Sequence, residues 1–470
     1  MRRTMPTIAH LLAVPSVGGY YCEDLAALQS RPMSVAERYA APGVTSGFRR
    51  VREVAEAVSV GLVLDDGRVA WGDCVAVAYS GKAGRWPVFR ADEGIAAVRQ
   101  VVAPALAGQS VAEFRTLAAK IDGLMETVVV ERPAEAPHDQ RAGGVSRRDL
   151  LTGRFLRADG GESPRMERVA VTQPLHTAVR YGVSQALLQA TALARGLTMA
   201  EVIADEWELP LPSEPVPIHA QSGGDRYANV DKMIARRVAS LPHALVDNIP
   251  EQLGRDGSGL VQYARWVKER IQALAGSDYR PTIHLDVHGA LGQVFDNNLG
   301  KVLGVLYALE TAVRPYALRV ECPVMMDSRD AQIDAMRTLR QYVRARGMGV
   351  HLVADEWANT LDDIRAFVDA QAADMIQIKM PDLGSVHNTV DAVLVCKQGG
   401  VGAFLGGSCA ETDISARVSV HVALAARPDI VMAKPGMGVD EAVMLAQNEM
   451  GRALAEIGQR CHTNSTGRTS

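Results

Sequence analysis

The sequence VHLVADEWANTLDDIRAFVDAQAADMIQIKMPD, residues 350–382, holds two short apolar runs joined by one longer amphipathic run. The outer runs, 350–357 and 375–382, have the length and apolar content of strands, and the middle run, 360–373, places its apolar residues at helical spacing. A strand, a helix and a second strand in this order indicate a parallel βαβ unit. Pro381 ends the second strand just beyond Lys379, so a basic side chain stands at the tip of that strand.

The same rhythm continues through the C-terminal half of the chain. From Pro215 onward, short apolar runs alternate with amphipathic runs, and eight of the short runs are candidate strands: 216–223, 244–249, 282–289, 317–322, 350–357, 375–382, 402–409 and 430–436. We therefore predict a (β/α)8 TIM-type barrel over 213–460, with 461–470 as a C-terminal tail. A doubly wound sheet is the alternative, but none of these strands is followed by a glycine-rich phosphate fingerprint.

Residues 1–212 follow a different pattern. Strand-like runs with a hairpin signal at 65–67 precede helical runs that finish on glycine, which predicts an α+β domain that caps the barrel. Within it, residues 131–168 are charged, rich in glycine and proline and poor in apolar periodicity over most of their length. We interpret them as a surface insertion.

The overall composition narrows the class of protein. Hydrophobic residues make up 47% of the 470 residues, and Lys+Arg 50 against Asp+Glu 54 gives no basic excess, so nucleic acid is not an expected partner. The six cysteines form no C-x-x-C pair, which fits a reducing cytoplasm rather than a zinc knuckle or a disulfide framework. No run approaches the roughly 20 apolar residues of a membrane span. His10 and Pro15 interrupt the N-terminal apolar run, so we expect a first strand there rather than an export signal.

Four consecutive barrel strands end on a charged side chain: Asp286, Glu321, Asp355 and Lys379. The C-terminal strand ends of such a barrel form its catalytic face. Three carboxylates that converge there repel one another unless a cation lies between them, and all-oxygen ligation suits Mg²⁺. Asp355 and Glu356 are adjacent, so only one of them is expected to point inward. Asp355 is chosen because its place at the strand end parallels that of the other two acids.

His284, Asp286 and His288 alternate and so share one face of their strand. Histidines suit zinc, which keeps open a metal-dependent hydrolase of the amidohydrolase type. Asp355 and Lys379 stand on later strands where such an enzyme would need further histidines.

Three strand-end acids followed by a lysine resemble the metal triad and base of the enolase superfamily. Longer motifs resemble one family within it, the methylaspartate ammonia-lyases, over nearly the whole chain apart from the insertion and a short tail. The motifs are VGGYY (17–21), LHTAVRYG (175–182), AQSGGDRY (220–227), LPHALVDN (241–248), LVADEW (352–357), QIKMPDLG (377–384), GGSCAET (406–412) and AKPGMGVDEAVMLAQNEM (433–450).

The resemblance implies a carbon–nitrogen lyase that removes ammonia reversibly from L-threo-3-methylaspartate to give mesaconate, a step of amino-acid degradation that includes glutamate catabolism. The reaction would abstract a proton next to a carboxylate and pass through an enediolate. The implied cofactor is Mg²⁺, with a monovalent cation as an optional addition. The implied partners are a small amino diacid and a second copy of the chain, in a cytoplasmic homodimer.

The resemblance also implies a role for each site residue. Asp286, Glu321 and Asp355 would bind Mg²⁺, Lys379 would be the base for the (S)-configured carbon, and His243 the second base on the opposite face of the substrate. The implied substrate-binding residues are Gln221, Gln377, Ser408 and Cys409.

The chain departs from the family pattern near the site, at Ser408, Met380, His288 and Cys322, where the family commonly has threonine, threonine, tyrosine and glycine. These departures leave room for another amino diacid as substrate. A racemase or cycloisomerase of the superfamily, or a barrel that has kept only a binding role, are further alternatives.

Overall fold

The computed structural model describes residues 5–31, 33–133, 166–244, 246 and 248–466. The chain divides into two compact units, residues 1–123 with 176–470, and residues 124–175.

The larger unit contains a closed barrel of eight parallel strands. Strands that follow one another in sequence are hydrogen-bonded neighbours, and the last strand pairs with the first to close the ring. The predicted (β/α)8 barrel is confirmed, and the doubly wound alternative is wrong. The strands are β6 (Ile218–His219), β7 (Ser240–His243), β8 (Thr282–Asp286), β9 (Leu318–Glu321), β10 (Val350–Ala354), β11 (Met375–Lys379), β12 (Gly402–Gly406) and β13 (Ile430–Met432).

Amphipathic helices connect the barrel strands. Four of them, α12, α13, α14 and α16, begin at a residue whose side chain accepts a hydrogen bond from the first turn, as Thr360 does from the Asp363 amide at the start of α14. The helices are α9 (Ala228–Ala235), α10 (Ser258–Leu274), α11 (Ala290–Val294), α12 (Leu299–Val313), α13 (Arg329–Ala345), α14 (Leu361–Asp369), α15 (Val386–Gln398), α16 (Asp413–Ala426) and α17 (Val439–Thr466), with short helical turns at Ile249–Leu253 and Pro435–Met437.

The second barrel strand lies earlier than the sequence predicts. It was expected at 244–249, whereas β7 ends at His243. Pro242 argues against a central strand because it lacks a backbone donor, yet its carbonyl still accepts a hydrogen bond from the Ser222 amide at 2.9 Å. The earlier position makes His243 a strand-end residue, level with Leu285 of β8.

An antiparallel three-stranded sheet precedes the barrel, in the order β1 (Ile8–Glu23), β2 (Arg52–Leu64), β3 (Val69–Cys74). The predicted first strand and the hairpin at 65–67 are confirmed. The helices of this region are α1 (Leu25–Ser30), α2 (Val35–Ala40), α3 (Ala91–Ala97), which continues through a π turn (Val98–Val102) into α4 (Ala103–Leu106), α5 (Phe114–Asp122), α7 (Thr177–Arg195) and α8 (Met199–Glu206).

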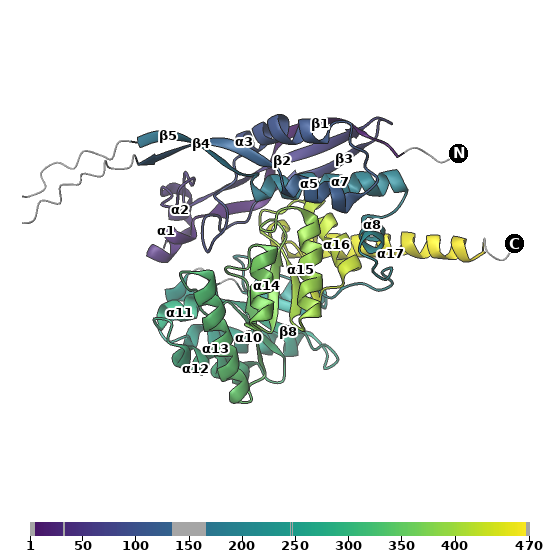
Figure 1. Cartoon of the computed structure of the whole chain (residues 1–470). Coiled ribbons are helices and arrows are strands. Elements are labelled where there is room, and N and C mark those ends of the chain that lie inside the picture. The colour runs from purple at the N-terminus through teal and green to yellow at the C-terminus, as the bar shows by residue number, and fades with distance from the viewer. Residues whose placement is uncertain (1–4, 32, 134–165, 245, 247, 467–470) are drawn as a thin grey trace, which may run out of the picture. The chain divides into compact units, whose positions relative to one another are not determined.

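Helix α7 joins this sheet to the barrel. It packs against β2 and β3 on one side and meets α15 and α16 of the barrel on the other (Figure 1). The architecture of an α+β region followed by a barrel is the one expected from the resemblance to the enolase superfamily.

The smaller unit is a hairpin of β4 (Met125–Pro133) and β5 (Met166–Pro174), paired antiparallel from Met125 opposite Pro174 to Pro133 opposite Met166. The predicted insertion, 131–168, therefore begins and ends within this strand pair, and its central part, 134–165, lies outside the described residues. At the other end of the chain, α17 continues to Thr466, into the segment predicted as a tail.

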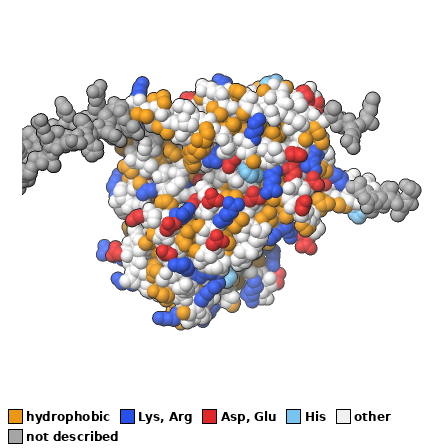
Figure 2. Space-filling model, viewed as in Figure 1, with side chains coloured by type: hydrophobic (Ala, Val, Ile, Leu, Met, Phe, Trp, Pro, Cys, Tyr) orange, Lys and Arg blue, Asp and Glu red, His pale blue; other side chains and the backbone are white. Residues whose placement is uncertain are grey.

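Charged side chains of both signs are interspersed over the face of the molecule shown in Figure 2. Among the described helices, none combines the length and the apolar character required to cross a bilayer.

Two glycines let α7 approach the sheet closely. A Cβ at Gly182 would lie 2.4 Å from the Cys74 amide nitrogen, and a Cβ at Gly72 would lie 2.1 Å from the Gly182 carbonyl oxygen. Real Cβ atoms do not approach backbone atoms so closely, so any side chain at Gly182 would push α7 away from β3.

Replacing Gly182 with alanine is expected to lower the free energy of unfolding by about 1–3 kcal/mol, the usual cost of overpacking a rigid core. The matched control is Gly451→Ala in α17, where a Cβ meets nothing within 4 Å and where alanine favours the helix. Urea unfolding of both variants measures the effect, and equal midpoints for Gly182→Ala and wild type would contradict the close approach.

Candidate active site

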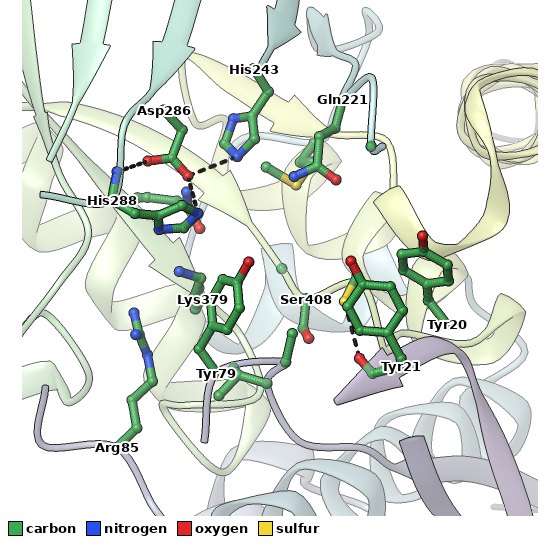
Figure 3. Close-up of a pocket in the computed structure, with 17 residues that line it drawn as sticks. Tyr20, Tyr21, Tyr79, Arg85, Gln221, His243, Asp286, His288, Lys379 and Ser408 are labelled. Carbon is green, nitrogen blue, oxygen red and sulfur yellow. Dashed lines mark hydrogen bonds and ion pairs between the residues drawn. The ribbon is translucent and has the colours of Figure 1, made fainter. Parts of the chain in front are cut away.

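One pocket opens at the C-terminal end of the barrel strands, and residues of the N-terminal sheet region complete its wall (Figure 3). Seven of the nine residues singled out from the sequence line it, and the other two are Glu321 and Asp355. The lining residues are Tyr20, Tyr21, Val77, Ala78, Tyr79, Arg85, Gln221, Gly223, His243, Asp286, His288, Gln377, Lys379, Gly407, Ser408, Cys409 and Met432.

The three predicted metal-binding carboxylates lie together at this end of the barrel. Asp286 and Glu321 are the last residues of β8 and β9 and stand directly opposite each other in the strand register. Asp355 follows the last residue of β10. All three are at most 2% exposed, so their charges are held away from water and need partners.

Each of these carboxylates has donors beside it. The Nε2 atoms of His288 and His243 lie 3.0 and 3.3 Å from Asp286 Oδ2. Glu321 accepts from His284 Nε2 at 2.7 Å and from the Gln377 side chain. Burial works against ionisation of Asp286, but His288 and His243 hold its pKa well below the ordinary value.

Lys379 ends β11 and donates to Asp355 Oδ2. Burial and the Arg85 guanidinium lower the pKa of Lys379, but Asp355, Glu356 and Glu321 together raise it above the ordinary value. The lysine is therefore a cation unless another positive charge offsets these acids.

Arg85 is a functional residue that sequence analysis missed. Its guanidinium enters the barrel end from the loop after β3 and contacts three carboxylates: Glu356 at 2.5 Å, Asp382 at 3.0 Å and Asp355 at 3.4 Å. Neither spacing nor a motif marked it, because its partners lie about 270 or more positions away in the chain.

The expectation that only one of Asp355 and Glu356 points inward is wrong. Both contact Arg85, and both lie with His288 in a group whose ligand-type atoms are within 4.8 Å of one another. Strand β10 ends at Ala354, so strand alternation no longer governs the two residues.

Three imidazoles, of His219, His243 and His284, lie close together at this end of the barrel, and His243 lines the pocket. His219 of β6 lies 4.7 Å from His284 and 5.2 Å from His243 between ring centroids. Burial, followed by the neighbouring His284 and His243, holds the pKa of His219 well below the ordinary value, so this ring is neutral. His243 Nδ1 lies 3.2 Å from His219 Nε2, and this contact fixes which way the His243 ring faces.

The predicted substrate-binding residues divide between two sides of the pocket. Gln377 donates its amide to Glu321 and keeps a buried Oε1 with no donor among the described residues. Gln221 follows β6, and Ser408 and Cys409 follow β12. Cys409 Sγ lies 3.3 Å from the Tyr21 carbonyl, which ties the loop after β12 to the VGGYY segment.

The order of strands sets these groups across the barrel from one another. In the ring of eight, β7 with His243 and β11 with Lys379 are four strands apart in either direction, and so are β8 with Asp286 and β12, which precedes Ser408. The two bases therefore face each other across the pocket, and so do the acid side and the serine loop.

Two groups of described residues have ligand-type atoms within 4.8 Å of one another: His243, His284 and Glu321, and His288, Asp355 and Glu356. Neither is the predicted triad, although each contains one of its members. The assignment of Asp286, Glu321 and Asp355 to a metal therefore stays a prediction.

The chain is similar to known proteins of one family over both of its halves. A family model described as the methylaspartate ammonia-lyase C-terminus matches residues 210–459, and the corresponding N-terminus model matches 6–137 and 148–208. Methylaspartate ammonia-lyase 2 of Carboxydothermus hydrogenoformans is 44% identical over 453 residues, which cover 96% of this chain and 99% of the relative.

Two solved structures are similar along the whole chain. The magnesium complex of β-methylaspartase from Clostridium tetanomorphum has a TM-score of 0.79 and 39% identity, covering 97% of this chain and all of the other. The Citrobacter amalonaticus methylaspartate ammonia-lyase containing (2S,3S)-3-methylaspartic acid has a TM-score of 0.82 and 40% identity, covering 96% and 100%.

Replacing Arg85 with methionine is expected to lower the free energy of unfolding by about 3–5 kcal/mol, because buried carboxylates would lose the positive charge that compensates them. The matched control is Arg337→Met on α13, which pairs with the exposed Asp334. Its loss should change stability by less than about 0.5 kcal/mol. Urea unfolding compares the two. An Arg85→Met midpoint as close to wild type as that of the control would show that the carboxylates do not depend on Arg85.

Proposed function

This chain belongs to the methylaspartate ammonia-lyase family, and we propose that it eliminates ammonia reversibly from L-threo-3-methylaspartate to give mesaconate. The observation that carries the proposal is the gathering of Asp286, Glu321, Asp355 and Lys379 at the ends of four successive strands, at the end of the barrel where the pocket opens. The hydrolase alternative loses its support, because the family match extends over both halves of the chain.

The charge of the site supports Mg²⁺ as the cofactor. Five carboxylates are buried at this end of the barrel, Asp286, Glu321, Asp355, Glu356 and Asp382, against the positive charges of Arg85, Lys379 and His288. An all-oxygen triad with an excess of negative charge fits a small hard cation. We assign Asp286, Glu321 and Asp355 as the residues that would hold it, and a monovalent cation remains an optional addition.

Bound Mg²⁺ would stabilise the negative charge that develops on the substrate carboxylate next to the carbon that loses its proton. Lys379 would take that proton with Nζ. It can do so only as a neutral amine, and extra positive charge among Asp355, Glu356 and Glu321 would offset the acids that raise its pKa.

His243 would act from the opposite side of the substrate on the epimer at the same carbon. Its position on β7, across the barrel from β11, supports this role, and so does its Nε2, which points towards Asp286 (Figure 3). The hydrogen-bond contact with the neutral His219 keeps the ring in place.

The remaining groups would hold the substrate across the pocket. Gln377 Oε1 is a buried acceptor suited to the substrate ammonium group, with Gln221 beside it in the pocket lining. Ser408 and Cys409 would receive the second carboxylate, because β12 lies opposite β8 in the barrel. This placement puts the reacting carbon between Lys379 and His243.

We further propose that residues 1–212 form a capping domain and 213–460 the catalytic barrel, and that the protein works as a cytoplasmic homodimer in amino-acid degradation. The division of the matched family models near residue 209 supports the domain boundary. Charge of both signs on the face in Figure 2 suits a small-molecule enzyme rather than a nucleic-acid binder.

The direct test is the ultraviolet absorbance of the conjugated diacid product after mixing the protein with Mg²⁺ and threo-3-methylaspartate. We expect growth of absorbance that EDTA abolishes and that added Mg²⁺ restores. A flat trace from folded protein, together with turnover of another amino diacid, would assign the chain to a different substrate and point to Ser408, Met380, His288 and Cys322 as the cause.

Replacing each of the two bases in turn should affect turnover of the two substrate epimers differently. Lys379→Ala is expected to lower turnover of the (2S,3S) substrate by at least about a thousandfold, the upper range for general-base catalysis, while His243→Ala should mainly reduce turnover of the (2S,3R) epimer. Steady-state rates on both epimers measure this, with Mg²⁺ binding and circular dichroism as controls of the site and the fold. Equal losses on both epimers in each variant would refute the division of roles.

A further inference from the structure

A second lysine stands at a strand end of this barrel and takes no part in the proposed chemistry. Lys434 follows β13, and its side chain is only 1% exposed. Its Nζ donates to the Gly406 carbonyl at 2.9 Å and lies 3.4 Å from Glu411 Oε1. A buried lysine needs such partners. Gly406 is the last residue of β12, and Glu411 lies in the loop that follows it.

Lys434 packs directly behind the pocket wall. A Cβ at Gly407 would lie 2.4 Å from Lys434 Nζ and 2.9 Å from Glu411 Oε1. Gly407, Ser408 and Cys409 line the pocket. The lysine therefore touches the back of the same short segment whose front faces the substrate space.

The bond to Gly406 fixes the orientation of the next peptide unit. The described cis peptide bonds are Leu241–Pro242 and Arg314–Pro315, so the Gly406–Gly407 unit is trans. In a trans unit the carbonyl and the following N–H point in opposite directions. Because the carbonyl points to Lys434, the Gly407 N–H points away from the lysine.

Three consecutive amides of this pocket-lining segment are available. The N–H groups of Gly407, Ser408 and Cys409 have no hydrogen-bond acceptor among the described residues, whereas the next amide, of Ala410, donates to Ser408 Oγ at 3.2 Å. Successive free backbone amides in a turn form a concave site for an anion such as a carboxylate.

The charge of Lys434 is balanced away from the pocket. Glu411 takes the ion pair and accepts a hydrogen bond from the Tyr181 hydroxyl at 3.1 Å. Burial lowers the pKa of Lys434, and the Glu411 carboxylate opposes that shift. The bond to Gly406 persists in either protonation state, since a neutral amine still has N–H donors.

We propose that Lys434 is a positioning residue: by holding the Gly406 carbonyl, it turns the amides of Gly407 to Cys409 towards the pocket to receive the substrate carboxylate farther from the Mg²⁺ ligands. The inference rests on the proposed function, which places that carboxylate at the loop after β12. The competing explanation is that Lys434 only neutralises the buried Glu411.

The test separates the two explanations by removing both charges together. The single variant Lys434→Met leaves the buried Glu411 carboxylate without a positive partner. The double variant Lys434→Met/Glu411→Gln leaves no unpaired buried charge, and the glutamine still accepts a hydrogen bond from the Tyr181 hydroxyl. We expect the double variant to fold, to raise KM for threo-3-methylaspartate and Kd for mesaconate by roughly 10- to 100-fold, and to change kcat less. Glu411→Gln alone keeps the Gly406 bond and should raise KM less.

The matched control is Lys397→Met, which removes another lysine that donates to a backbone carbonyl, Ala426 at 3.1 Å, far from the pocket lining. It should leave KM and Kd unchanged. Mesaconate binding is measured by calorimetry with Mg²⁺ present. A double variant with the KM and Kd of wild type would establish the charge-neutralising role and overturn the proposal.

Two further outcomes are also decisive. If the double variant does not fold, Gly407→Ala displaces the lysine without removing a charge, and an unchanged mesaconate Kd in that variant would overturn the proposal. If wild-type protein fails to turn over threo-3-methylaspartate, the proposed function is wrong, and the Kd comparison with mesaconate still decides the role of Lys434. Absence of mesaconate binding by wild type would overturn both.

Discussion

The structure depends on the compensation of buried negative charge at one end of the barrel. Asp286, Glu321, Asp355, Glu356 and Asp382 are each at most 5% exposed there. Carboxylates removed from water are stable only when cations and hydrogen bonds surround them. Arg85 and Lys379 supply two fixed charges, and His288, whose pKa Asp286 and Glu356 raise to about 10 in spite of burial, supplies another. The remaining excess is what makes this end of the barrel suited to a divalent cation.

The N-terminal part of the chain does more than cover the barrel end. Arg85 reaches the residues after β10, while Asp122 and Ser184 accept hydrogen bonds from the amides of Ser385 and Val386 at 3.3 and 2.9 Å, just after the strand that carries Lys379. These contacts fix the loops that follow β10 and β11. Preorganised loops matter because a base must lie within hydrogen-bond reach of the proton that it removes.

Sequence analysis succeeded where the information was local. Strand and helix periodicity predicted seven of the eight barrel strands near their observed places, and the end of each strand could be read for its side chain, as with Asp286 and Lys379. It failed at β7, where Pro242 masks a strand, and at Glu356, because β10 ends at Ala354, before the two residues to which the alternation was applied. In both places tertiary pairing overrides the local pattern.

The sequence by itself determined the barrel, the acids and bases at its strand ends and the family resemblance, because periodicity and motif are properties of neighbouring residues. Only the tertiary structure decided which side chains meet. Arg85 with Asp382, Cys409 with the Tyr21 carbonyl and Tyr181 with Glu411 are contacts between segments separated by 230 to 388 positions. The closed ring also set His243 opposite Lys379, a relation that follows from the strand order around the barrel and from no local pattern.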